Sequence, residues 1–204
     1  MKIGIYGGSF NPVHFGHTGL AIWIARHTDL DEVWLMVTPN NPLKDSDILA
    51  PEKERYEAAC KAVEAAVRKE EETEGIRLKP IRVSDFEFTL PKPNYTAKTL
   101  SLLSRAFPQH EFCLIIGEDN WHLFTRWREW ESIGCNYTIY VYPRKSSSLQ
   151  QAERQADTSG FKCVRFLYDA PLFDISSTQL RLSKNSPRKC SPLSSGSSHS
   201  GSCL

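Results

Sequence analysis

The feature that most constrains the fold of this chain is the alternation of short apolar runs with segments of helical periodicity. In HTGLAIWIARHTDL, for example, Leu20, Ile24 and their apolar neighbours recur at a spacing that lets a helix bury one face. Apolar runs that alternate with such helices favour a sheet of mostly parallel strands. We therefore predict an α/β fold: a Rossmann-like, doubly wound, mostly parallel sheet with helices on both faces.

The predicted elements follow one another in a regular order. We predict strands over residues 2–6, 31–39, 75–86, 110–117, 137–144 and 161–170, and helices over residues 17–30, 51–72, 96–107, 127–133 and 148–156. Because ligands of parallel α/β sheets collect at the carboxyl ends of the strands, the segment after the first strand is a candidate site by position alone.

The end of the chain has a different composition. The stretch KNSPRKCSPLSSGSSHSGSCL is rich in serine, proline and glycine and shows no hydrophobic period. Such a composition cannot bury enough apolar surface to hold a fixed structure. We therefore expect residues 1–184 to form one domain and residues 185–204 to be a disordered tail.

Charge and cysteine content bear on the possible partners. The formal net charge is +1, with 25 basic and 24 acidic residues, so no broad surface for nucleic acid or anionic lipid is indicated. The six cysteines are scattered without a zinc-binding spacing, and we predict no metal site in the protein. No apolar stretch reaches the roughly 18 residues of a membrane span, and no signal peptide is indicated. We expect a cytoplasmic protein without nucleic-acid or membrane partners, and a homo-oligomer is compatible with the sequence.

The segment GGSFNPVHFGH, which follows the first predicted strand, combines residues that suit a phosphate site. Gly7 and Gly8 allow a sharp turn that exposes backbone N–H groups, and the start of the next helix adds a positive dipole. His14 and His17 can reach the same side, where imidazole donates to phosphate, and Gly16 lets a ligand approach the backbone. We predict that this loop holds the phosphates of a nucleoside triphosphate, without a P-loop or a G-x-G-x-x-G pattern.

This loop resembles the H-x-G-H motif of a nucleotidyltransferase superfamily, and within it the bacterial nicotinate mononucleotide adenylyltransferases. The second motif of that superfamily, I-S-S-T-x-[IL]-R, resembles ISSTQLR in this chain. Its own chemistry agrees, because a serine-rich helix start offers hydroxyls and free amides to phosphate and Arg181 adds a forked cation. The resemblance extends from about Met1 to Arg181 and implies that residues 1–184 are a nucleotidyltransferase domain.

The two motifs together define an expected ATP site. We expect catalysis to depend on His14, His17, Lys44 and Arg181, where the resemblance of PNNPLK to the segment after the family's second strand supplies the lysine. The residues expected to bind ATP belong to the two motifs and are Gly7, Gly8, Ser9, Phe10, Gly16, Ile175, Ser176, Ser177 and Thr178. Arg55 falls where the family often carries an arginine that supports the site.

The resemblance also implies how the second substrate is bound. PNYTAKTL resembles the family segment S-Y-T-x-D-T-L and places Tyr95 and Thr96 beside a pyridine carboxylate. Two positions depart from that pattern: Asn94 replaces the serine and Lys98 replaces the acid. The remaining expected substrate-binding residues include Gly117 and, after the strand at 137–144, Arg144.

A third segment, GEDNWHLFTRW, resembles the family's G-A-D with a tryptophan eight residues after the aspartate. The resemblance implies that Asp119 binds a ribose hydroxyl and that Trp127 stacks on the pyridine ring. A carboxylate accepts hydrogen bonds from a diol, and a flat aromatic side chain suits a flat ring. Trp121 and Trp130 lie close in the sequence and compete with Trp127 for this role.

The activity that the resemblance implies is adenylyl transfer from ATP to nicotinate mononucleotide, with Mg²⁺ arriving on ATP rather than at a dedicated protein site. A sister enzyme, such as pantetheine-phosphate adenylyltransferase or a cytidylyltransferase, would keep the first loop without the NYT and Asp119–Trp127 features. A fragment of a class I aminoacyl-tRNA synthetase would need a tRNA-binding module. A nucleotide-binding protein without catalysis is the alternative from another class, and pyrophosphate release would discriminate against it.

Overall fold

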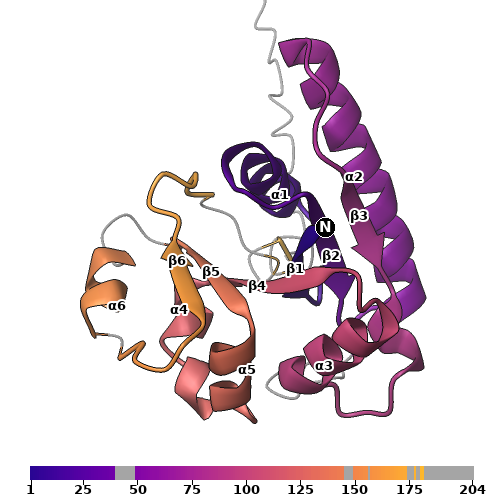
Figure 1. Ribbon diagram of the computed structural model, residues 1–204. Helices are drawn as coiled ribbons and strands as arrows, with labels where there is room; N and C mark the ends of the chain where they lie inside the picture. The colour runs from indigo at the N-terminus through magenta and orange to yellow at the C-terminus, as the bar shows by residue number, and fades with distance from the viewer. Residues whose placement is uncertain (40–48, 145–148, 156, 174–176, 178–179, 182–204) are drawn as a thin grey trace, which may run out of the picture.

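The computed structural model describes residues 1–39, 49–144, 149–155, 157–173, 177, 180 and 181. Its six strands form one sheet in the order β3-β2-β1-β4-β5-β6, and every neighbouring pair is parallel (Figure 1). The chain enters at β1 in the middle, builds one edge with β2 and β3, and then returns to add β4, β5 and β6 on the other side. The predicted doubly wound α/β fold is confirmed.

The elements alternate as the sequence predicts. In chain order they are β1 (Lys2–Gly8), α1 (Phe15–His27), β2 (Glu32–Val37), α2 (Glu52–Glu74), β3 (Ile81–Ser84), η2 (Phe86–Thr89), α3 (Thr96–Ala106), β4 (Glu111–Gly117), α4 (Glu118–Trp121), η3 (Phe124–Arg126), α5 (Trp130–Asn136), β5 (Thr138–Tyr142), α6 (Leu149–Gln155) and β6 (Cys163–Phe166).

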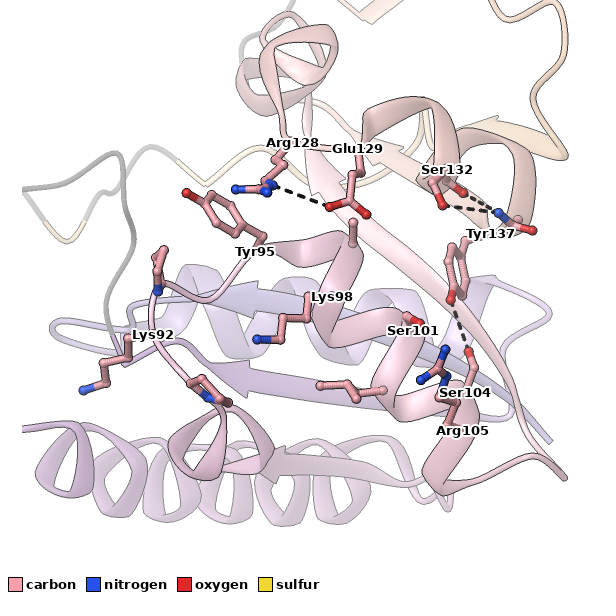
Figure 2. Close-up of a pocket in the computed structure, with 15 residues that line it drawn as sticks. Lys92, Tyr95, Lys98, Ser101, Ser104, Arg105, Arg128, Glu129, Ser132 and Tyr137 are labelled. Carbon is pink, nitrogen blue, oxygen red and sulfur yellow. Dashed lines mark hydrogen bonds and ion pairs between the residues drawn. The ribbon is translucent and has the colours of Figure 1, made fainter.

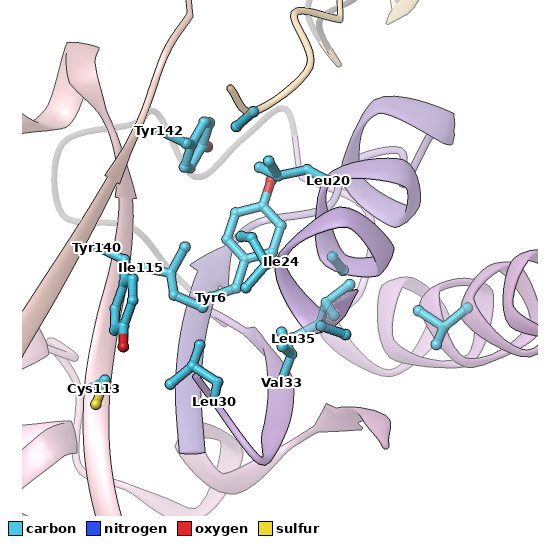
Figure 3. Close-up of a cluster of buried hydrophobic side chains, with 14 of the residues drawn as sticks. Tyr6, Leu20, Ile24, Leu30, Val33, Leu35, Cys113, Ile115, Tyr140 and Tyr142 are labelled. Carbon is cyan, nitrogen blue, oxygen red and sulfur yellow. The ribbon is translucent and has the colours of Figure 1, made fainter. Parts of the chain in front are cut away.

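The apolar strands serve two hydrophobic cores, one on each face of the sheet. Successive strand residues point to opposite faces, so Ile115 of β4 packs with α1 and α2, whereas Leu114 packs with α3 to α6. Figure 3 shows the first of these cores, in which Leu20 and Ile24 of α1 face Tyr6 of β1. Because both faces are covered, the strands are apolar almost without interruption, as in parallel sheets generally.

Several element boundaries differ from the predicted ones for local reasons. The strand predicted at 75–86 pairs with β2 only over Ile81–Ser84. This strand begins after Pro80, which has no N–H to give to a sheet ladder, although its carbonyl accepts from the Val33 N–H at 3.0 Å. The helix predicted at 127–133 begins later, at Trp130, because Glu129 directly before it adopts the left-handed backbone with φ of 57°.

Two features of the chain's organisation bear on the earlier expectations. The predicted domain boundary at residue 184 and the predicted tail at 185–204 lie outside the described residues. Among the described residues, none of the helices combines the length and the apolar content that crossing a bilayer requires.

Candidate active site

The candidate site lies at the carboxyl ends of β1 and β4, the neighbouring strands at which the strand order reverses. Helices α1 and α2 cover one face of the sheet, and helices α3 to α6 cover the other face. Gly117 ends β4 where a side chain has no room: an added Cβ would meet the Asp119 carboxylate and the Arg144 Nε atom, the latter at 3.1 Å. Only glycine therefore fits at the end of β4, next to the Asp119 and Arg144 side chains.

The turn after β1 is made differently from the prediction. Gly7 and Gly8 belong to the strand, whereas Phe10 adopts the left-handed backbone with φ of 45°. This conformation is uncommon for a residue with a side chain. The Phe10 ring is buried under the loop, and an added Cβ on Gly8 would lie 3.1 Å from it. Glycine at position 8 thus makes room for the Phe10 ring rather than for a turn.

The two histidines stand together at the start of α1. His14 precedes the helix and His17 lies in its first turn, and their ring centroids are 3.7 Å apart. The His14 backbone N–H donates to Nδ1 of His17 at 3.2 Å, which leaves Nε2 of a neutral His17 as the ring's N–H donor. The Phe10 ring contacts His17 edge-on with centroids 5.0 Å apart. The loop therefore fixes both the position and the tautomer of His17.

His14 is held in its neutral form by its surroundings. Burial, and then the nearby Arg144 cation, lowers the pKa of His14. Its Nδ1 atom is buried without a hydrogen-bond partner in the described part of the chain. A buried polar atom of this kind is costly unless a ligand or water completes it. His14 can therefore offer a neutral N–H group to an anion.

The second motif lies against the first loop. The Ser177 hydroxyl donates to the Pro12 carbonyl at 2.9 Å, and Arg181 donates through Nη1 to the Asn11 carbonyl at 2.5 Å. Segments more than 160 residues apart in the sequence thus meet beside His14. The other predicted residues of this motif, Ile175, Ser176 and Thr178, and the predicted lysine, Lys44, lie outside the described residues.

Arg55 connects the loop to the ends of two strands. This buried side chain of α2 donates to the carbonyls of Ser9 at 2.5 Å, of Thr38 and Pro39 at 3.0 Å each, and of Ala50 at 2.8 Å. One guanidinium thus satisfies four backbone carbonyls from separate segments of the chain. Arg55 orients the backbone of the site without lining either of its pockets among the described residues.

Two hollows open at this edge and share a wall made by Tyr6 and Tyr142. The large pocket, of about 410 Å³, extends from Gly7 and Gly8 to α3 and Trp127. The histidine pocket, of about 20 Å³, is lined by His14, Gly16 and His17 together with Phe173. The rings of Tyr6 and Tyr142 pack edge to face with centroids 5.9 Å apart. Burial raises the pKa of both phenols, so they remain protonated donors.

The residues predicted to bind the second substrate are divided between these places. Tyr95, Thr96, Gly117 and Trp127 line the large pocket. Arg144 lines the histidine pocket, with its guanidinium 5.6 Å from the centre of the Tyr142 ring. Asp119 lines neither pocket among the described residues and lies 3.5 Å from Arg144 Nε. Both partners of this ion pair are partly exposed, so its energy is small.

The structure separates Trp127 from the competing tryptophans. Trp127 is half-buried on the large pocket, and its Nε1 atom has no hydrogen-bond partner among the described residues. Trp121 is buried against Phe124, and Trp130 packs on Phe161. Neither of these two tryptophans lines the large pocket. The geometry therefore favours Trp127 for stacking on a ligand.

The sequence reasoning missed a buried polar group in the large pocket. Glu87 is only 5% exposed, and Thr99 donates to its Oε1 atom at 2.7 Å. Asn94 donates to the Glu87 backbone carbonyl at 3.2 Å, yet Oε2 of Glu87 and Oδ1 of Asn94 have no partner among the described residues. Burial raises the pKa of Glu87. The signal in the sequence was a lone acid in an apolar stretch, FEFTL, between two predicted elements.

No cluster of three or more His, Cys, Asp or Glu side chains able to hold a metal ion occurs among the described residues. The predicted absence of a dedicated metal site stays a prediction, because residues outside the described ranges are not tested. Mg²⁺ that arrives on a nucleotide needs no such cluster.

The fold and the meeting of the two motifs define a class of nucleotide-handling α/β proteins, and the comparison with known proteins identifies it. The sequence profile of the cytidylyltransferase-like family matches residues 5–183, and the chain belongs to this family. Within it, the chain belongs with the nicotinate-nucleotide adenylyltransferases, a group of nucleotidyltransferase enzymes.

Two relatives named as probable nicotinate-nucleotide adenylyltransferases carry that assignment. The protein from Bacteroides fragilis is 42% identical over 180 residues, which are 88% of this chain and 80% of the relative. The protein from Cytophaga hutchinsonii is 44% identical over 181 residues, which are 89% of this chain and 84% of the relative.

A solved structure supports the fold. Nicotinic acid mononucleotide adenylyltransferase from Plasmodium falciparum, complexed with NaAD, superposes with a TM-score of 0.67 at 19% sequence identity. The match covers 89% of this chain and 82% of that protein. At this level of identity the likeness concerns the fold alone.

Proposed function

We propose that this protein transfers the adenylyl group of ATP to nicotinate mononucleotide, giving nicotinate adenine dinucleotide and pyrophosphate. The family supplies the class of reaction, and relatives at 42% and 44% identity carry that name. The observation that carries the proposal to this site is the contact between the two motifs. Ser177 and Arg181 hydrogen-bond to the loop that leads into His14.

The reaction is an in-line displacement. A phosphate oxygen of the mononucleotide attacks the α-phosphorus of ATP, the bond from that phosphorus to the bridging oxygen breaks, and pyrophosphate leaves with the electron pair. The attacking phosphate is already ionised near neutral pH, so no protein nucleophile or strong base is required. The protein has to align two anions and stabilise the charge that develops between them. Mg²⁺ enters as part of the ATP substrate.

The histidine pocket supplies donors for the phosphates. The lowered pKa keeps His14 neutral, and His17 presents its Nε2–H because Nδ1 accepts from the backbone. Neutral N–H donors at a helix start stabilise developing negative charge without the desolvation cost of a buried cation. Lys44 and Arg181 are assigned to the outer phosphates, and backbone N–H groups of the loop complete the ATP site.

The large pocket suits the mononucleotide. Its volume of about 410 Å³ is within the range of small-molecule sites. Trp127 offers a ring face for the pyridine, and Tyr95 and Thr96 at the start of α3 offer backbone and hydroxyl donors for a carboxylate. Asp119 and Arg144 lie at the edge near Gly117, where the ribose and phosphate have to pass toward His14 and His17.

The test is incubation with ATP, Mg²⁺ and each pyridine mononucleotide in turn, followed by identification of the products. We expect nicotinate adenine dinucleotide and pyrophosphate, with kcat/KM for the nicotinate form well above that for the nicotinamide form. Equal kcat/KM values for the two mononucleotides would contradict the proposal that the protein recognises the pyridine carboxylate. Turnover of 4′-phosphopantetheine instead, or of CTP in place of ATP, would favour a sister enzyme, and ATP binding without pyrophosphate release would favour a non-catalytic protein.

We also propose that residues 1–184 suffice for this activity and that the enzyme works in the cytoplasm without nucleic-acid or membrane partners. A chain that ends at residue 184 is expected to keep the kcat and KM of the full chain. Sedimentation of the full chain, with and without substrates, will determine whether it forms a homo-oligomer.

A further inference from the structure

A second hollow, the α3–α5 groove, lies beside the candidate active site. Its volume is about 830 Å³, and it is bounded by residues 91–93, by α3 and by the segment from Arg128 to Tyr137 that includes α5 (Figure 2). Among the residues that the structure describes, only Tyr95 and Arg128 line both this groove and the large pocket. The groove is therefore a neighbour of the substrate site and not a part of it.

The charges in the groove are one-sided. Four cationic side chains line it against one carboxylate, that of Glu129, although the whole chain has a net charge of only +1. Two of the cations have acidic neighbours: Lys92 lies 3.3 Å from Glu52, and Arg128 lies 3.5 Å from Glu129. A groove lined by one sign of charge concentrates ions of the opposite sign.

The other two cations, Lys98 and Arg105, have no acceptor. Both are exposed, and neither makes an ion pair or a side-chain hydrogen bond with any other residue that the structure describes. They are seven residues apart in α3, which places them two turns, or about 10 Å, apart on one side of the helix. Figure 2 shows them with Ser101 between them along the groove.

The rest of the lining is also rich in donors. The Ser104 hydroxyl donates to the Leu100 carbonyl at 3.0 Å and lies 3.3 Å from the Tyr137 hydroxyl, and the Asn136 amide donates to the Ser132 carbonyl at 2.8 Å. The hydroxyls of Ser101 and Ser132 complete this polar lining. Hydroxyl and amide groups next to cations are the usual partners of phosphate oxygens. The lining thus offers positive charge and hydroxyl groups to an anion, beside the apolar side chains of Pro91, Pro93, Ala97 and Leu102.

One of the unpaired cations is also a departure from the family pattern. Lys98 stands where the resembling segment S-Y-T-x-D-T-L carries an acid. Replacement of an acid by a lysine changes the charge at this place by two units. The anion-attracting character of the groove is therefore a property of this chain and is independent of the two motifs of the active site.

We propose that the α3–α5 groove binds a small phosphorylated anion with more than one phosphate group, in addition to the substrates. Lys98 and Arg105 hold the two ends of the anion, and the hydroxyls between the helices bind its oxygens. The proposal does not depend on which mononucleotide the enzyme uses.

The experiment is a calorimetric titration of the full chain with inorganic tripolyphosphate. Wild-type protein is expected to bind two equivalents, one at the histidine pocket and one in the groove. The double substitution Lys98→Glu with Arg105→Glu should remove the second equivalent, or weaken it at least about tenfold. Its kcat and KM without tripolyphosphate should match those of wild type.

A matched control carries the same change of charge elsewhere. Lys61 and Lys69 are exposed lysines of α2 without ion pairs among the described residues, and Lys61→Glu with Lys69→Glu should keep both equivalents. A single equivalent in wild type that the groove variant retains would overturn the proposal. So would two equivalents in the groove variant, or an equal loss in groove variant and control, because the effect would then follow from net charge alone.

Discussion

The large pocket and the histidine pocket share a wall made by Tyr6 and Tyr142, yet their volumes differ widely. The large pocket has a volume of about 410 Å³, and the histidine pocket has a volume of about 20 Å³. Strand ends and α3 build the walls of the large pocket, and the sheet fixes their backbone. Side chains fill the histidine pocket, whose remaining space holds about one water molecule. In the proposed reaction, the pocket for the mononucleotide is therefore already open in the folded protein. The pocket for the ATP phosphates has to open, by movement of side chains, before ATP can bind.

The Phe173 ring lines the histidine pocket on the side of α1. It lies so near to α1 that an added Cβ on Gly19 would be 2.7 Å from it, and it contacts the ring of the exposed Phe15 with centroids 5.9 Å apart. Such a ring can leave without disturbing the sheet. The comparison predicts that substitutions on the two sides will act on different kinetic constants.

The largest effect is expected at His17. His17→Ala should lower kcat by about two orders of magnitude or more, because removal of one donor to the charge in the transition state costs about 2.7–4 kcal/mol. Pyrophosphate release measures kcat, and circular dichroism verifies the fold. His27→Ala, at the other end of α1, is the matched control and should keep the wild-type rate. A near-normal rate in the His17 variant would contradict the proposal that the histidine pocket stabilises charge in the transition state.

A smaller effect on a different constant is expected at Trp127. Trp127→Ala should raise KM for nicotinate mononucleotide about tenfold, because a lost ring contact in a preformed pocket costs about 1.4 kcal/mol, while KM for ATP should stay unchanged. Initial rates against each substrate give both constants. Trp130→Phe is the control from the same aromatic cluster. If KM for ATP rose instead, the two pockets would not be divided between the substrates as proposed.

Glu87 tests how rigidly the large pocket is built. Burial raises its pKa above the ordinary value of 4.5, so above pH 4.5 the folded state keeps a proton that the unfolded state has lost. Stability therefore falls as pH rises from 4.5 toward the raised folded pKa. Glu87→Gln cannot titrate and keeps the shape of the side chain, and its Oε1 can still accept from the Thr99 hydroxyl.

We expect this variant to gain about 1 kcal/mol over wild type near neutral pH and to lose the gain at acidic pH. Urea unfolding near pH 7 and below pH 4.5 measures the free energy of unfolding of both proteins. Parallel stability curves for variant and wild type would show that Glu87 ionises in the folded protein, and that the pocket contains water where the described atoms leave Oε2 without a partner.

The smallest effect is expected at Phe173. If its ring closes the histidine pocket, Phe173→Ala should lower KM for ATP about threefold, since the binding-competent form is then populated without displacement of the ring. KM for the mononucleotide should not change. A rise in KM for ATP would mean that the ring contacts the bound nucleotide. The histidine pocket would then not be closed by this ring, and the proposed difference between the two pockets would be wrong.

Much of the fold followed from the sequence because the strands are buried on both faces. Runs such as EFCLIIG can be read without knowing their neighbours, and β4 lies within one residue of its predicted start. The short elements η2, α4 and η3 were missed, because three or four residues are too few to show a hydrophobic period. The start of β3 was missed because pairing, and not propensity, decides where an edge strand begins.

The site was predictable in part. The spacing of His14 and His17 anticipated adjacent rings, and the meeting of the two motifs agrees with the expected two-sided grip on a nucleotide. The roles of these residues stay predictions. Two features could not be read from local sequence: Phe10, not a glycine, takes the left-handed turn, and Glu87 and Asn94 become a buried polar pair through tertiary contacts.

The central position of β1 has a consequence for how the protein is made. Strand β1 is synthesised before both of its partners, β2 and β4, and the segment that packs on its loop through Ser177 and Arg181 emerges later still. While the ribosome adds these residues, the nascent chain carries an apolar strand with one edge unpaired, a state that invites chaperones or aggregation. The loop after β1 is thus among the last parts of the described fold to mature.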